Sequence, residues 1–165
     1  MEDLRYDFAK ETYKVECDRE NSLNSKGQVY LSLLTIILST LIFNIKDIFD
    51  LLNTSNFNNI KNEIKICLLG VFIFSCVALI LLFFSMKIFE YQNLKNIDEL
   101  KESYIQDKID NNNFSIRRSI DFLVATKKNR EVNNTKAKLL KIVFIAIFIA
   151  FVFSFLFLTL IITKI

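Results

Sequence analysis

Residues 142–163 read IVFIAIFIAFVFSFLFLTLIIT, a run of 22 residues without a charge between Lys141 and Lys164. As an α-helix rising about 1.5 Å per residue, this run is about 33 Å long. That length is enough to cross a hydrocarbon core of about 30 Å. The stretch therefore predicts a membrane-spanning helix.

Two further apolar runs precede it in the chain. Residues 66–89 are interrupted only by Lys87, and residues 27–45 form a shorter and more polar run. Three such runs in 165 residues disfavour the alternative, a buried core helix of a soluble protein. We therefore predict an all-α membrane protein with transmembrane helices at 27–45, 66–89 and 139–164.

The distribution of basic residues predicts how the chain is oriented. Of the 21 Lys and Arg residues, 17 lie within residues 1–28 and 87–141, and the other 4 lie beyond the opposite ends of the spans. Basic residues are enriched on the cytoplasmic side of membrane proteins. We expect a cytoplasmic N terminus, an external loop at residues 46–65 and an external C terminus.

The segments on the cytoplasmic side are predicted to be helical extensions of the spans. Residues 1–26 and residues 90–138 are each too short to bury a core alone. They contain no Pro and many charged helix-forming residues. We expect each transmembrane helix to continue into a cytoplasmic stalk or crown, whose arms pack together and against copies of themselves. The alternative is that the arms are partly disordered.

Asn111-Asn112-Asn113 is the one strong turn signal between the second and third spans. It predicts that residues 90–138 form a helical hairpin turning at 111–113. After the turn, Ile116, Ile120 and Leu123 share one side of the second arm, which we expect to be its packing side.

Composition excludes several classes of active site. The chain has no His, 3 Cys and 2 Gly. It therefore lacks the residues for a Cys/His zinc site, a Ser-His or Cys-His catalytic pair, or a Gly-rich phosphate loop. The spans also lack acids and bases at depth, so we expect no enzymatic activity and no cofactor.

A polar residue recurs along the first helix at alternating spacings of four and three. The series is Lys14, Asp18, Asn21, Ser25, Gln28, Ser32, Thr35 and Ser39. This spacing places the whole series on one face, which should not face lipid. Two interpretations stay open: hydrogen bonding within or between helices, and the lining of a water-filled path formed by several copies. The candidate pore-lining residues are Gln28, Ser32, Thr35, Ser39 and Phe43, with Phe43 as a hydrophobic constriction.

Basic residues on the cytoplasmic side are candidates for binding an anion or a nucleotide. They are Arg19, Lys26, Arg117, Arg118, Lys127, Lys128, Arg130 and Lys136. Around the membrane entry, Arg19, Lys26, Asn133 and Lys136 suggest a polar collar. It could pair with nearby glutamates such as Glu16, hold lipid phosphates or hold a ligand, and the sequence leaves these alternatives open.

The third span has two different faces. Small residues at Ala146, Ala150 and Ser154 form a ridge that allows another helix to approach closely. The opposite ridge is aromatic and consists of Phe144, Phe148, Phe151 and Phe155. We expect the small ridge to pack and the Phe ridge to face lipid.

Two helix entries carry a resemblance to a known group of proteins. They are Tyr13-Lys14-x-Glu16-x-x-Arg19-x-x-Ser22-Leu23-x-Ser25-Lys26 and Asn129-Arg130-Glu131-Val132-Asn133-Asn134-x-Lys136-Ala137. Together with the layout of the spans, they resemble small membrane effectors of bacterial anti-phage systems. The Hailong membrane effector type is the nearer resemblance, and the Pycsar transmembrane effectors are the second.

This resemblance implies an oligomeric ion channel or pore-forming effector of the bacterial inner membrane, acting in abortive infection. It implies gating or inhibition by a nucleotide or short DNA oligomer made by a partner nucleotidyltransferase. Because the chain has no separate nucleotide-binding domain, a composite site between copies is favoured. We expect a homo-oligomer, with four copies as the working number, in contact with membrane lipids. The alternative is a non-conducting membrane adaptor whose stalk docks a partner protein.

Overall fold

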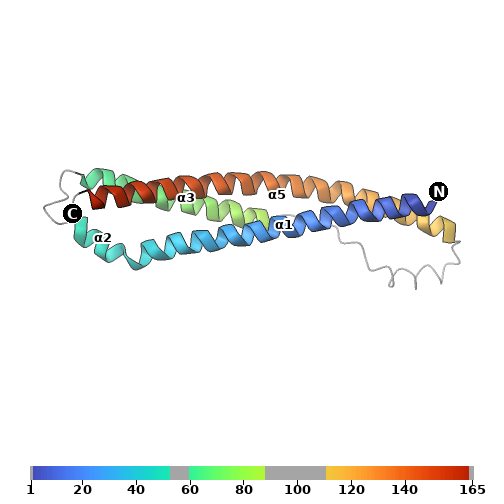
Figure 1. Cartoon of the computed structure of the whole chain (residues 1–165), viewed down its shortest axis with the longest axis horizontal. Helices are drawn as coiled ribbons and strands as arrows, with labels where there is room; N and C mark the ends of the chain where they lie inside the picture. Colours follow the sequence, from blue (N-terminus) through green and yellow to red (C-terminus); the bar gives the residue numbers. More distant parts are fainter. Residues whose placement is uncertain (1, 53–59, 88–110, 164–165) are drawn as a thin grey trace. The chain divides into compact units, whose positions relative to one another are not determined.

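The computed structural model describes residues 2–52, 60–87 and 111–163, and within these residues the chain forms helices and no strand (Figure 1). The helices are α1 (Glu2–Phe43), α2 (Ile45–Leu52), α3 (Lys61–Lys87) and α5 (Asn111–Ile162). Helices α1, α3 and α5 are long and apolar enough to cross a membrane. The predicted all-α membrane protein with three transmembrane helices is confirmed.

Two of these helices continue from a charged arm into an apolar span without a break. Helix α1 has 42 residues and α5 has 52. No Pro removes a backbone donor anywhere in the chain, so nothing forces a kink where the composition changes. Residues 111–113, expected to be a turn, are instead the first residues of α5. The expected first arm of the hairpin, residues 90–110, lies outside the described residues.

Helix α2 begins at Ile45 and covers residues 46–52 of the range 46–65 that we expected to be an external loop. Asn44 separates it from α1, and the Asn44 side-chain amide donates to the Thr40 carbonyl at 2.8 Å. The backbone N–H of Ile48 then donates to the Asn44 carbonyl at 3.0 Å. Two turns of helix fit in this range because apolar Ile45, Ile48 and Phe49 are spaced to share one face.

The chain divides into two compact units, each of which contains part of α1 and part of α5. Unit 1 consists of Met1–Asn24 and Phe89–Ala137, and unit 2 of Ser25–Ile88 and Lys138–Ile165. In unit 1 the two helices run in parallel, since Tyr6 and Tyr13 contact Phe122 while Glu16 contacts Asn133 further along both helices. The expected packing of α1 against the second arm is confirmed.

The α5 arm is buried against α1 through Phe122. Phe122 and Ala125 are buried, and the Phe122 ring lies 5.8 Å from the Tyr6 ring and 5.4 Å from the Tyr13 ring between centroids. Ile116, Ile120 and Leu123 are exposed in the single chain and border a cavity that Leu4 and Phe8 of α1 also line. Packing of this side against another copy stays a prediction.

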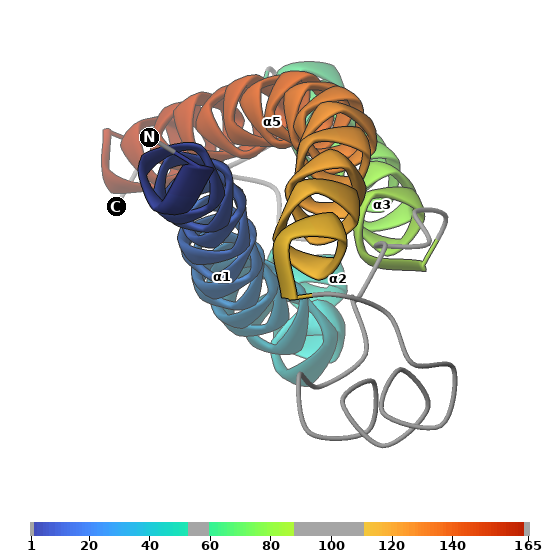
Figure 2. The ribbon, with the colours of Figure 1, turned by 90° about the vertical axis from the view of Figure 1, so that its right-hand side faces the viewer.

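In unit 2, α3 lies beside α5 and α1 also packs against both helices (Figures 1 and 2). The small residues of α5 pack as expected, with Ala146 and Ala150 buried. The opposite ridge is exposed, with Phe144 at 53% and Phe148 at 59%. In α3, Ala78 and Ser85 are buried. Small side chains therefore let the backbones of the spans approach one another.

The closest approach in unit 2 is at Gly70 of α3. A Cβ atom added there would lie 2.9 Å from the Phe153 ring, and the ring is already stacked on Phe74 at a centroid distance of 5.9 Å. At Gly27 of α1, an added Cβ would lie 3.9 Å from Leu140 and Leu82, an ordinary contact. The two glycines thus form a matched pair for testing the packing.

We predict that Gly70→Ala destabilises unit 2, because the Phe153 ring must move away from Phe74. Overpacking of this kind costs about 1–3 kcal/mol, against a gain of about 1 kcal/mol in helix propensity. Gly27→Ala has the propensity gain without the clash. Thermal unfolding in detergent should show a lower midpoint for Gly70→Ala and an equal or higher one for Gly27→Ala. Equal midpoints for both variants would contradict this packing.

Candidate functional site

Helix α1 has two faces that lie on opposite sides of it. Its buried face includes Leu23, Gly27 and Leu34. The polar face is the series from Lys14 to Ser39 defined above. Each of these three buried residues follows a member of the polar face by two positions, as Gly27 follows Ser25. Two residues of an α-helix correspond to a rotation of about 200°. The packing of α1 on α3 and α5 therefore turns the polar face away from both helices.

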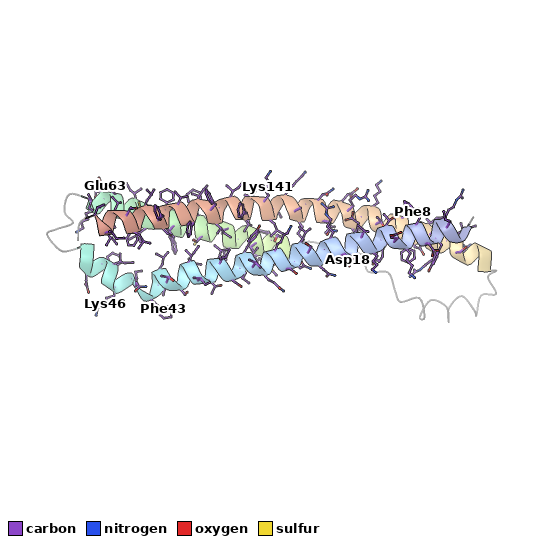
Figure 3. The ribbon with its side chains drawn as sticks, viewed as in Figure 1. Phe8, Asp18, Phe43, Lys46, Glu63 and Lys141 are labelled. Atoms are coloured by element: carbon purple, nitrogen blue, oxygen red, sulfur yellow. The ribbon has the colours of Figure 1, made fainter. Side chains whose placement is uncertain are left out.

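The exposure of the candidate pore-lining residues agrees with this geometry. Gln28, Ser32 and Thr35 are exposed, and Ser39 is half-buried. Phe43, at the end of α1, is 84% exposed and projects away from α5 (Figure 3). Gln28, Ser32 and Thr35 are thus not buried by packing inside one chain.

The hydroxyl groups on the polar face donate to the backbone of their own helix. Ser32 Oγ donates to the Gln28 carbonyl at 3.0 Å, and Thr35 Oγ1 donates to the Leu31 carbonyl at 2.9 Å. Ser39 Oγ donates to the Ile36 carbonyl at 3.1 Å. Each hydroxyl keeps acceptor lone pairs, because it has one donor and two acceptor positions. These oxygens form a row of exposed acceptors on a helix that spans the membrane.

A second polar feature is buried between α1 and α5 in unit 1. The Glu16 side chain accepts a hydrogen bond from Arg130 Nε at 3.0 Å and another from Asn133 Nδ2 at 3.0 Å. Asn133 Nδ2 also lies 2.9 Å from the Glu16 carbonyl oxygen. Arg19 lies 3.5 Å from Glu16, and it donates to Asn134 Oδ1 at 2.8 Å. We call these five residues the Glu16 cluster.

Burial and hydrogen bonding act on Glu16 in opposite directions. Removal from water raises the pKa of the Glu16 carboxyl, whereas the bonds from Asn133 and Arg130 and the charges of Arg19 and Arg130 lower it. The net result is a pKa below the ordinary value of 4.5. Glu16 is therefore ionised at neutral pH, although it is only 4% exposed.

After Arg19 and Arg130, Lys136 is the third candidate cation with a contact between α1 and α5. Its ammonium donates to Asn24 Oδ1. Burial lowers the pKa of Lys136, and the nearby carboxylate of Glu20 opposes this effect only in part. Of the four residues anticipated in the polar collar, Arg19, Asn133 and Lys136 form hydrogen bonds between α1 and α5, and Lys26 is exposed.

The remaining candidate cations fall into two groups. Arg118 is buried, lies 5.0 Å from the centre of the Phe122 ring, and has Asp121 at 4.0 Å. The others are exposed and are not part of the Glu16 cluster. These exposed cations are Lys26, Arg117, Lys127 and Lys128.

Sequence reasoning missed the buried amide of Asn129 and the role of Asn24. Asn129 and Asn133 are both fully buried on α5. Asn129, Asn133 and Lys136 are spaced by four and three residues, the spacing of the buried positions of a helix. This spacing is the sequence signal from which their burial could have been predicted. In the described part of the chain, no three His, Cys, Asp or Glu side chains gather as a metal site would require.

No protein-family model, curated protein or solved structure matches this sequence. The polar face of α1 and the Glu16 cluster are therefore the features of the chain that indicate its function.

We predict that acid weakens the pairing of α1 and α5 in unit 1. Because the folded-state pKa of Glu16 is lowered, its contribution is complete above about pH 4.5 and is lost as the pH falls through the folded value. Glu16→Gln should cost about 1–3 kcal/mol at neutral pH, the usual value of hydrogen bonds to a charged group.

Hydrogen exchange of the backbone amides in residues 5–24, corrected for the intrinsic exchange rate at each pH and measured from pH 7 to well below pH 4.5, tests this. Glu16→Gln should exchange faster at pH 7 and lose most of the acid sensitivity. Glu11→Gln, at an exposed position on the same helix, serves as the control and should behave like the original protein. An unchanged exchange rate in Glu16→Gln would count against the cluster.

Proposed function

We propose that this protein is a homo-oligomeric membrane channel in which the polar faces of α1 from several copies surround a water-filled path. The observation that carries the proposal is the exposure of Gln28, Ser32 and Thr35 opposite the packing face of a membrane-spanning helix. Hydrocarbon offers no partner to the acceptor lone pairs that the two hydroxyls keep or to the side-chain amide of Gln28. Grouping the polar faces around a common axis gives them water and leaves the apolar faces of α3 and α5 toward lipid.

The chemistry of the path follows from its lining. Within the span, the polar face has hydroxyl and amide groups and no charged residue; the charges of Lys14 and Asp18 lie in unit 1. A pore without a ring of charge discriminates weakly among ions. Phe43, at the end of the row, is the proposed hydrophobic constriction, which closes by excluding water.

The proposed setting is the bacterial inner membrane, with a cytoplasmic N terminus and an external C terminus. The excess of basic residues before the first span and between the second and third supports this orientation. The resemblance of the helix entries to anti-phage effectors supports a role in abortive infection. We propose that a nucleotide or oligonucleotide controls the channel through the exposed cations Arg117, Lys127 and Lys128.

The rival function is that of a non-conducting adaptor. That function requires the polar face of α1 to be buried against the other helices of the same chain. The exposure of Ser32 and Thr35 disfavours it. A binding or conducting role also accounts for the chain better than an enzymatic one, because the spans contain no acid or base.

We predict that replacing two hydroxyl residues of the polar face blocks conduction. The double variant Thr35→Leu with Ser39→Leu makes the path apolar over one turn of α1, so conductance should fall more than about tenfold by dewetting. Planar-bilayer recordings on purified protein, with and without candidate nucleotides, measure this. Light scattering in detergent should give an unchanged number of copies.

The matched control is Thr159→Leu in α5 with Thr163→Leu directly after the end of α5. Both threonines are exposed, have the same spacing of four, and donate to their own backbone. Conductance should survive in this control. If the original protein never conducts, or if Thr35→Leu with Ser39→Leu breaks the oligomer, the polar face is a packing surface and the channel proposal fails.

We predict that a change at Phe43 raises conductance, the opposite of the effect of Thr35→Leu with Ser39→Leu. Phe43→Ala removes the large apolar ring from the proposed constriction, so resting conductance should rise, whereas Phe43→Leu should change it less. Dye leakage from vesicles that contain the purified variants measures the difference. Identical leakage from the original protein and from Phe43→Ala would remove Phe43 from the path.

A further inference from the structure

Unit 2 contains a cavity of about 450 Å³ whose walls come from α1, α2, α3 and α5. This volume lies within the range of about 300–1,000 Å³ that ligand sites occupy. The walls are mainly apolar and include Ile48, Leu68, Val71 and Phe157. All four contributing helices meet here at the end of unit 2 where Lys46 and Glu63 lie (Figure 3).

The few polar side chains of the cavity are bonded to nearby backbone carbonyls. Thr40 Oγ1 donates to the Ile36 carbonyl at 2.8 Å, and Ser154 Oγ donates to the Ala150 carbonyl at 3.0 Å. The Asn44 amide is bonded to the Thr40 carbonyl. The other lining residues are all apolar, so the cavity suits an occupant that is mainly apolar.

Packing closes the cavity on one side and leaves it open on another. Ile64 is fully buried, and Ile48 of α2 and Leu68 pack against it. On the other side, Ile36 and Phe151 line the cavity although each is 62% exposed. Since these residues belong to membrane-spanning helices, the open side meets the acyl chains of the bilayer.

A second cavity of about 270 Å³ adjoins the first and adds a cation to it. The two share Leu41, Ile48 and Leu68, and the exposed Lys65 lines the second. Along α3, Leu68 lies about 4.5 Å beyond Lys65, and Val71 lies about 9 Å beyond it. An ammonium at the rim, followed by an apolar cavity at greater depth, matches the order of phosphate and acyl chain in a phospholipid.

We propose that unit 2 holds one phospholipid molecule, with an acyl chain in the cavity and its phosphate on Lys65. Helix α2 has a structural role in this site, because Ile48 lines both cavities and packs on Ile64. The site is independent of conduction, so either proposal can fail without the other.

The test is native mass spectrometry of the purified full chain after delipidation in detergent and titration with phosphatidylglycerol. One lipid should bind per chain. Ser154→Phe places a ring in the cavity and should lower occupancy at least about tenfold. Lys65→Ala should weaken binding about fivefold through the loss of one phosphate contact, and Lys65→Arg should restore it.

Matched controls separate a specific site from general lipid contact. Val152→Phe adds the same ring at an exposed position of α5 outside the cavity, and Lys46→Ala removes an exposed cation that lines neither cavity. Both should bind lipid normally. Thr40→Leu, at an exposed position that lines the cavity, gives a second test if Ser154→Phe does not fold.

Three results would overturn the proposal. The first is the absence of a bound lipid on the original protein, and the second is equal lipid loss in Ser154→Phe and Val152→Phe. The third is a lipid-free oligomer of the original protein that dissociates in the Ser154→Phe variant. That result would mean that a second copy of the chain, and not a lipid, fills the cavity.

Discussion

Hydrocarbon cannot solvate a row of polar side chains, and the packing of α1 leaves such a row outside its own bundle. The buried residues Gly27 and Leu34 and the polar residues Ser25 and Ser32 differ by only two positions, which is enough to place them on opposite faces. A single chain therefore satisfies its small-residue contacts and leaves Gln28, Ser32 and Thr35 exposed on the side away from α3 and α5. These exposed polar residues within the span are the physical reason for proposing an assembly of several copies.

The two units stabilise their helix pairs by different means. Unit 2 relies on close approach at small residues such as Gly70 and Ala150, because two apolar helices gain no hydrophobic free energy from leaving lipid. Unit 1 buries charge, and Glu16 is tolerated there because Arg130 and Asn133 hydrogen-bond to it. Buried polar groups of this kind can fix the register of paired helices. Glu16 opposite Asn133 fixes the parallel alignment of α1 with α5.

The long helices were predictable from the sequence, because apolar runs and the lack of Pro act locally. The packing role of Ala146 and Ala150 was also predictable, since only small residues allow close approach. Helix α2 was missed although its apolar residues share one face, because its two turns lie in a range that was assigned as a loop between spans. The contact between Phe122 and Tyr13 was not predictable, because it joins residues far apart in sequence. The partners of Glu16 depend on the same long-range pairing.

In the proposed channel, water reaches the polar face of α1 within the membrane. Single cysteines at positions 28, 32, 35 and 39, in a chain whose 3 native cysteines are replaced, can be exposed to a charged, membrane-impermeant thiol reagent in native membranes. Single cysteines at positions 33 and 148, where Leu33 and Phe148 are exposed away from the polar face, report the lipid-facing surface. We expect labelling at the polar-face positions and none at 33 and 148. Equal labelling of both sets, or labelling of neither, would exclude a water-filled path along the polar face.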